Sequence, residues 1–108
     1  MVNSFSNYLK FGKVKKQTKD PELANSLLEQ SQERLQYVQE KEISKRNAKF
    51  VLEDAYEAVR ESAQALMAIK GYKPYSHEAT ISFVIEYYST KFSEEDISLF
   101  NHYRELRN

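Results

Sequence analysis

One uninterrupted segment, residues 47–70, constrains the fold of this chain more than any other. It contains neither Gly nor Pro, is rich in Ala, and precedes Gly71, the residue type that most readily takes the left-handed conformation just past a helix end. We therefore predict one helix from Asn47 to Lys70, placed at the centre of the fold, with small residues that let other helices approach closely. Its apolar residues recur at helical spacing, at Ala48, Leu52, Ala55, Val59, Ala63, Leu66 and Ile69, and Phe50, Val51, Ala58, Ala65 and Met67 widen the stripe.

Length and composition indicate one small, helical, water-soluble domain. A chain of 108 residues is long enough for one hydrophobic core and too short for two. It contains no Cys, which excludes disulfides, thiolate nucleophiles and thiolate metal sites. No apolar run approaches the roughly 20 residues of a membrane span, and the first residues lack the features of a secretory signal. The expected location is the cytoplasm, with no membrane association.

Charge is distributed unevenly although the net charge is zero. Residues 1–19 carry five Lys and no acid, a charge of +5, whereas residues 20–108 carry 11 basic and 16 acidic side chains, a charge of −5. We interpret residues 1–20 as a basic N-terminal arm, mostly coil with local helix, that folds back on the acidic remainder. Phe5, Tyr8, Leu9 and Phe11 are close enough to form one patch that docks there. The alternative is an arm that binds nucleic acid or an acidic partner.

Three further helices are predicted within the domain at residues 21–108. The first begins at Asp20 and Pro21 and runs to about Glu40 or Lys41, and Ser44 or Asn47 then caps the central helix. Gly71 to Ser76 is expected to be a loop, with Ser76 capping a helix from His77 to about Lys91. A last helix begins at Ser93. The fold class is therefore all-α, an up-and-down bundle of four main helices. The inward residues are expected at Leu27, Leu28, Ser31, Leu35 and Val38, then Ile81, Val84, Ile85 and Tyr88, and finally Ile97, Phe100, Tyr103 and Leu106.

Histidine and aromatic residues give little indication of chemistry. His77 and His102 lack the partner spacing of a zinc site, and neither follows a Glu three residues earlier as in carboxylate-bridged metal bundles, so no metal or cofactor is expected. His77 is expected to cap or orient its helix, and His102 to lie at a surface or interface. Most of the 14 Tyr and Phe side chains are assigned to core or interface rather than to stacking on bases, with Tyr72 and Tyr75 expected to be exposed.

A polar cluster ends the sequence. Arg104 and Asn108 lie one helical turn apart with Arg107 beside them, so donors gather on one helix face. Such a cluster could bind phosphate, or it could consist of cations placed favourably near a helix C-terminus.

From Leu27 to Asn108, the order of segments resembles the HEPN family of small helical proteins. The resemblance is carried by Ala55-Tyr56-Glu-Ala58-Val59-Arg-Glu-Ser-Ala63-Gln-Ala65-Leu66, then by Gly71 and Ser76-His77, and finally by Tyr103-Arg-Glu-Leu-Arg107-Asn108. Members typically form dimers, and many are metal-independent ribonucleases, often paired with a small nucleotidyltransferase in toxin-antitoxin systems. Their catalytic motif is an Arg, a polar residue and a His a few residues later.

The resemblance implies an RNA- or nucleotide-binding module with an incomplete catalytic motif. Arg107 and Asn108 match the first two motif positions, and no His follows in this sequence, so the chain is expected to be either a truncated or a catalytically incomplete member. Loss of the proton-transferring group costs on the order of 10²- to 10⁴-fold in rate. The expected phosphate-binding residues are Arg104 and Arg107, at the cleft of a homodimer formed by faces that include the last helix, with a nucleotidyltransferase as a possible partner. The alternative function is a non-catalytic bundle that binds or scaffolds other proteins.

Overall fold

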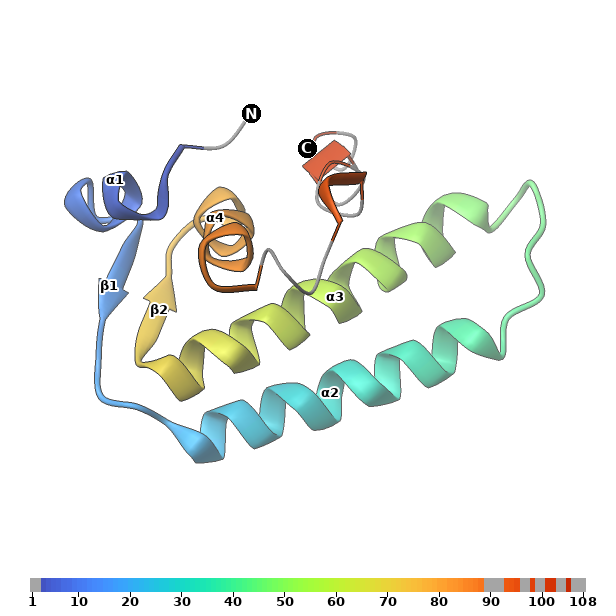
Figure 1. Cartoon of the computed structure of the whole chain (residues 1–108). Coiled ribbons are helices and arrows are strands. Elements are labelled where there is room, and N and C mark those ends of the chain that lie inside the picture. The colour runs from blue at the N-terminus through green and yellow to red at the C-terminus, as the bar shows by residue number, and fades with distance from the viewer. Residues whose placement is uncertain (1–2, 89–92, 96–97, 99–100, 103–104, 106–108) are drawn as a thin grey trace.

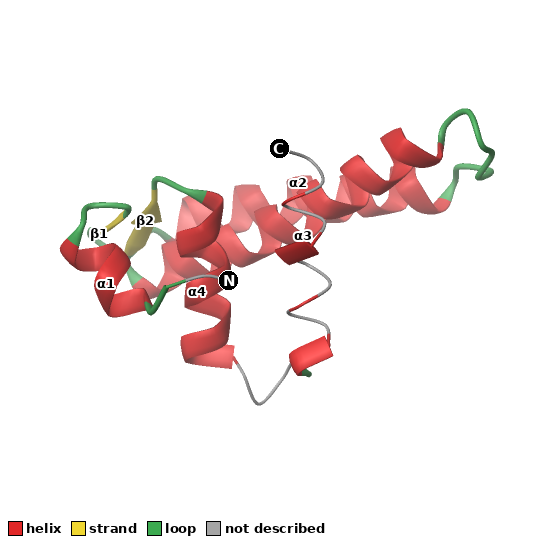
Figure 2. Cartoon of the chain, turned by 90° about the horizontal axis from the view of Figure 1, so that it is seen from above, coloured by secondary structure: helices red, strands yellow, loops and turns green. Residues whose placement is uncertain are grey.

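The chain folds into a mostly helical structure with one small two-stranded sheet. A computed structural model describes residues 3–88, 93–95, 98, 101–102 and 105. The elements in chain order are α1 (Phe5–Lys10), β1 (Val14–Lys16), α2 (Pro21–Gln39), α3 (Ala48–Lys70), β2 (Tyr72–Pro74) and α4 (His77–Tyr88). Helix α1 and the sheet lie at one end of the α2–α3 hairpin, and the turn between α2 and α3 lies at the other end (Figure 1, Figure 2). Among the described helices, none combines the length and the apolarity that crossing a bilayer requires.

The long central helix predicted from residues 47–70 is confirmed as α3. It ends at Gly71, whose φ of 86° is left-handed and whose N–H donates to the carbonyl oxygens of Ala68 and Met67. Helix α2 begins as predicted, with Pro21 in the first turn and the Asp20 carboxylate accepting from the N–H of Leu23 at 3.0 Å. Ser44 and Asn47 bond to each other in the turn that joins the two helices.

The residues that face inward along the α2–α3 hairpin differ from those predicted. Leu28 and Leu35 of α2, and Leu52, Val59 and Ile69 of α3, were expected to be inward and are exposed. Leu27 and Ser31 lie inward as predicted. The two helices meet along rows formed by Ala24, Leu27, Ser31 and Arg34 on α2 and by Asp54, Ala58, Glu61, Ala65 and Ala68 on α3. The small side chains of these rows allow close approach, and an ion-pair network fills the remaining space.

The N-terminal segment contains more structure than the predicted coil. Phe5 and Tyr8 of α1 and Val14 of β1 are buried in the main core beside Met67 and Phe83, whereas Phe11 is exposed. The expected loop after Gly71 contains β2, which pairs antiparallel with β1. A strand of three residues is too short for alternation to be recognised, so both strands were missed.

Helix α4 begins where predicted, with the Ser76 hydroxyl accepting from the N–H of Ala79 at 3.1 Å. Phe83, expected to flank the inner face, is fully buried, and Ile85, expected to be inward, is exposed. The predicted continuation of this helix, from 89 to about 91, lies outside the described residues. In the last predicted helix, the described residues Glu94, Glu95, Ser98, Asn101, His102 and Glu105 are helical, and the expected inward residues Ile97, Phe100, Tyr103 and Leu106 are not described.

Replacement of Gly71 by Ala is expected to destabilise the fold by about 2 kcal/mol. A Cβ at residue 71 would lie 2.8 Å from the backbone oxygen of Gln17, and the φ of 86° already disfavours any side chain. Gly12→Ala is the matched control, because Gly12 has a φ of 73° with no heavy atom within 4 Å of an added Cβ. Urea unfolding followed by circular dichroism should give a smaller loss for Gly12→Ala, about 1 kcal/mol. Equal losses would mean that contact with Gln17 is unimportant.

Candidate nucleic-acid interface

Seven lysines gather around the two-stranded sheet at one end of the hairpin. Five come from the N-terminal segment, and two come from the end of α3 and from β2. We call the lysines of these segments together the basic face; they are Lys10, Lys13, Lys15, Lys16, Lys19, Lys70 and Lys73, and the alternation along β1 turns Lys16 away from Lys15. Figure 1 shows β1 and β2 side by side between α1 and the end of α3. The pairing brings the charge of the N-terminal segment next to that of β2.

The register of the sheet places two of these lysines directly opposite each other. Lys15 of β1 pairs with Lys73 of β2, and the neighbouring Val14 is fully buried. Because successive strand residues point to opposite faces, burial of Val14 turns Lys15 outward. Two flanking backbone bonds hold this register: the N–H of Gln17 donates to the Gly71 oxygen at 2.9 Å, and that of Tyr75 to the Lys13 oxygen at 2.7 Å.

Exposed aromatic rings lie among the ammonium groups. The Nζ atoms of Lys15 and Lys73 are 5.3 and 5.6 Å from the centroid of the Tyr75 ring. At the edge of the basic face, Lys10 Nζ lies 5.9 Å from the ring of Phe11. These are cation–π distances, so the rings hold the ammonium groups in place and leave their positive charge available.

The basic face takes no part in the ion pairs found among the described residues. Those pairs join Arg34 to Asp54 and Glu61, and Arg60 to Glu57, all on α2 and α3. Like charges opposite each other across a strand pair destabilise a sheet. The repulsion between Lys15 and Lys73 is therefore a cost to stability, against which their cation–π contacts with the Tyr75 ring act.

A pair of tyrosines borders the basic face on the side of α4. The hydroxyl groups of Tyr72 and Tyr87 are 3.2 Å apart, and Lys70 Nζ lies 5.4 Å from the Tyr87 ring. The hydrogen bond with Tyr72, together with partial desolvation, raises the pKa of Tyr87 to about 12. Tyr87 is therefore a neutral hydrogen-bonding group at any physiological pH.

A groove of about 390 Å³ lies next to the basic face, where α2, the end of α3 and β2 meet. Its polar lining consists of Lys73, Tyr72, the amides of Gln17 and Gln64 and the carboxylate of Asp20. Leu23, Leu27, Ala68 and Pro74 supply an apolar lining. The groove thus combines an apolar surface with amide groups, as a site for a flat polar ring would require.

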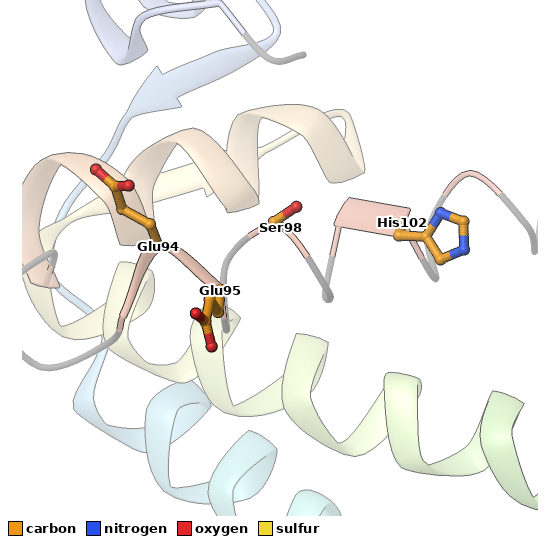
Figure 3. Close-up of a pocket in the computed structure, with 4 residues that line it drawn as sticks. All are labelled: Glu94, Glu95, Ser98 and His102. Carbon is orange, nitrogen blue, oxygen red and sulfur yellow. The ribbon is translucent and has the colours of Figure 1, made fainter.

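An open hollow of about 560 Å³ lies near the C-terminal residues, lined by Glu94, Glu95, Ser98 and His102 (Figure 3). In Figure 3 the two carboxylates point in different directions, and His102 lies farther along the chain. These side chains do not converge on one point, so they do not form a catalytic arrangement. Within the described part of the chain, no three His, Asp or Glu side chains are grouped so that they could hold a metal ion.

The residues predicted to bind phosphate, Arg104, Arg107 and Asn108, lie outside the described residues, as does most of the helix expected to form the homodimer. His77, predicted to orient its helix, has its Nδ1 3.4 Å from the Tyr56 hydroxyl. Sequence reasoning missed Lys73 and Tyr75 as partners of Lys15. The positive charge of residues 1–19 is evident from the sequence. The pairing of β1 with β2, which brings Lys70 and Lys73 close to that charge, is not.

Comparison with protein-family models, curated proteins and solved structures finds no significant match to this chain.

Proposed function

We propose that this chain is a helical module that binds single-stranded RNA through the basic face. One observation carries the proposal: Lys15 and Lys73 oppose each other across the sheet, with the exposed ring of Tyr75 within cation–π distance of both. Ammonium groups placed in this way neutralise neighbouring phosphates of one strand. The resulting electrostatic attraction offsets the repulsion between the two lysines when RNA is bound.

The surroundings supply contacts for the bases as well as for the phosphates. Phe11 and Tyr75 are exposed rings on which an unpaired base can stack. The amides of Gln17 and Gln64 in the adjacent groove are groups that hydrogen-bond to base edges. A paired duplex would not offer its bases to either of these features, so the arrangement favours a single strand.

The family resemblance belongs to the same proposal. A HEPN-type up-and-down bundle is consistent with the long α2–α3 hairpin and the mostly helical structure. In such a module, Arg104, Arg107 and Asn108 would form a second phosphate-binding group, and a nucleotidyltransferase would be a natural partner. The function that we propose for this chain is therefore binding of RNA.

Reversal of both opposed charges, in Lys15→Glu with Lys73→Glu, is expected to weaken RNA binding on the order of 100-fold at low salt. Fluorescence anisotropy with a labelled 12-nucleotide oligouridylate measures the affinity from 50 to 200 mM salt. Because two lysines no longer neutralise phosphates in this variant, the slope of log K against log salt should become shallower by about 1.4.

The matched control is Lys45→Glu with Lys49→Glu, which changes the net charge equally on exposed residues at the opposite end of the hairpin. This pair is expected to weaken binding less than threefold, which is of the order of a general charge effect. Equal weakening by both pairs, or no binding by the wild-type chain at 50 mM salt, would exclude the basic face as an RNA site.

The alternative function, a non-catalytic bundle that binds or scaffolds other proteins, is favoured by a different observation. A row of apolar side chains along α3 is exposed, including Leu52, Val59 and Ile69. A chain with this function alone would show no RNA affinity in the anisotropy experiment.

A further inference from the structure

The groove where α2, the end of α3 and β2 meet contains one carboxylate among its polar groups. It belongs to Asp20, the residue before α2, whose Oδ1 accepts a hydrogen bond from the N–H of Leu23 at 3.0 Å. Among the residues that the structure describes, this carboxylate makes no ion pair and accepts no second hydrogen bond. Because the two oxygens of a carboxylate offer about four acceptor positions, most of its capacity is unused.

Two glutamine amides in the same groove also have hydrogen-bonding capacity to spare. Gln17 follows β1, and Gln64 lies on α3. Neither side-chain amide makes a hydrogen bond within the described part of the chain. Each amide supplies both N–H donors and a carbonyl acceptor. The groove therefore offers amide donors together with the acceptor oxygens of Asp20.

Backbone hydrogen bonds hold the wall of the groove that carries Gln17 and Asp20. The N–H of Gln17 donates to the Gly71 oxygen at 2.9 Å, and the N–H of Asp20 donates to the Ala68 oxygen at 3.0 Å. The segment between β1 and α2 is thus tied at both ends to the end of α3, which lies beside the start of α2 in Figure 1. The groove volume of about 390 Å³ falls in the range of roughly 300 to 1,000 Å³ that is usual for small-molecule sites.

The rest of the lining suits one nucleotide of a bound strand. Leu23 and Leu27 lie one turn apart on the same face of α2, and together with Pro74 they give an apolar surface for the flat face of a base. Lys73 lines the groove and also belongs to the basic face. A base in the groove would therefore have its own phosphate close to an ammonium group.

We propose that this groove binds a guanine base of single-stranded RNA, an inference that rests on the RNA-binding function proposed above. Guanine is the one RNA base whose Watson–Crick edge presents two adjacent donors, the N1–H and the N2 amino group. The two oxygens of the Asp20 carboxylate accept both of these hydrogen bonds. The amides of Gln17 and Gln64 donate to the O6 and N7 acceptors of the same base.

The other three bases do not match a carboxylate. Adenine and cytosine each present an amino group beside an unprotonated ring nitrogen, and uracil presents one N–H between two carbonyl oxygens. In each case a lone pair of the base would face an oxygen of Asp20, which is an acceptor without a proton to donate. Capping of α2 does not require a carboxylate, since Asn and Ser cap a helix about as well as Asp.

Fluorescence anisotropy with three labelled 12-nucleotide oligouridylates tests the base preference at about 50 mM salt. The oligomers differ at one central nucleotide, which is guanosine, adenosine or inosine. The guanosine oligomer is expected to bind the wild type about tenfold more tightly than the adenosine oligomer. Inosine keeps the N1–H and lacks the N2 amino group, so its oligomer should bind only about threefold more tightly than the adenosine oligomer.

The variant Asp20→Asn removes one acceptor and keeps the helix cap, so its helix content and urea midpoint should match those of the wild type. In this variant the guanosine oligomer should bind no more tightly than the inosine oligomer, because an amide NH₂ group would face a donor of guanine. Glu22→Gln is the matched control: it changes the charge equally on an exposed residue of α2 that does not line the groove. It should keep the tenfold preference.

The outcomes separate this proposal from RNA binding itself. If the wild type binds none of the three oligomers, both proposals are overturned. If it binds the guanosine and adenosine oligomers equally, or if Asp20→Asn keeps the preference for guanosine over inosine, RNA binding stands and the guanine site is excluded. Guanosine monophosphate lacks the neighbouring phosphates, so it should displace the guanosine oligomer only at about 100-fold higher concentration. Displacement at equal concentration would assign the groove to a free nucleotide instead of a strand.

Discussion

Replacing Arg34 with Ala is expected to lower the free energy of unfolding by about 3 kcal/mol. Glu61 is buried on α3 at 3% exposure, and its carboxylate accepts a hydrogen bond from Arg34 Nε at 2.7 Å. Arg34 Nη1 also donates to Asp54 at 3.3 Å. This hydrogen bond with Glu61 raises the pKa of Arg34, which therefore stays charged at every accessible pH. Without the guanidinium, a buried carboxylate loses its cation.

The control for Arg34→Ala removes both charges together. Arg34→Met combined with Glu61→Leu leaves no buried charge, so most of the stability should return, as in other buried ion pairs replaced by apolar residues. Urea unfolding of Arg34→Met, of Glu61→Leu and of the variant with both changes gives a double-mutant cycle. The expected coupling free energy between the two residues is about 2 kcal/mol. If Arg34→Ala lowers the free energy of unfolding by less than about 1 kcal/mol, water stabilises the Glu61 carboxylate about as well as the Arg34 guanidinium does.

The helices with strong local signals could be predicted from the sequence. Helix α3 follows from a long segment without Gly or Pro and from the left-handed Gly71 at its end, and α2 follows from Asp20 and Pro21. These signals act between residues a few positions apart. They fix where a helix begins and ends and say little about which side of it is buried.

The buried side of the hairpin could be predicted only in part, at Leu27 and Ser31, because the contact between Arg34 and Glu61 is not local. Leu52 and Val59 belong to the more apolar row of α3, so apolarity alone places them inside. The contact between Arg34 and Glu61 instead turns the neighbouring row toward α2. A count of apolar residues does not detect a charged pair of this kind.

The candidate site was predictable in its charge and not in its geometry. The five lysines before Asp20 left an anion-binding segment open only as the alternative to an arm that folds back on the acidic remainder. Pairing of two three-residue strands determines that Lys15 meets Lys73 and Tyr75. The phosphate-binding role of Arg104 and Arg107, which lie beyond the described residues, stays a prediction.

Replacing Phe83 with Ala is expected to cost about 4 kcal/mol, the largest stability effect of any single change considered for this chain. Phe83 is fully buried, and its ring centroid lies 5.7 Å from that of Phe5 in α1 and 6.1 Å from that of Tyr72 in β2. A cavity at this place therefore weakens the packing that holds α1 and β2 against α4. Thermal and urea unfolding measure the loss, with Tyr37→Ala, an exposed aromatic residue, expected to stay within about 0.5 kcal/mol of wild type.

The Phe83 variant also tests whether the core positions the basic face. Because α1 and β1 pack on this core, the cavity should increase hydrogen exchange at the amides of residues 5–16 more than at those of α2. RNA affinity should fall as well, since the register of β1 places Lys15 opposite Lys73. RNA affinity and hydrogen exchange of residues 5–16 could both stay at wild-type values while the free energy of unfolding falls. In that case, the strand pairing alone, and not the aromatic core, would hold residues 5–16 in place.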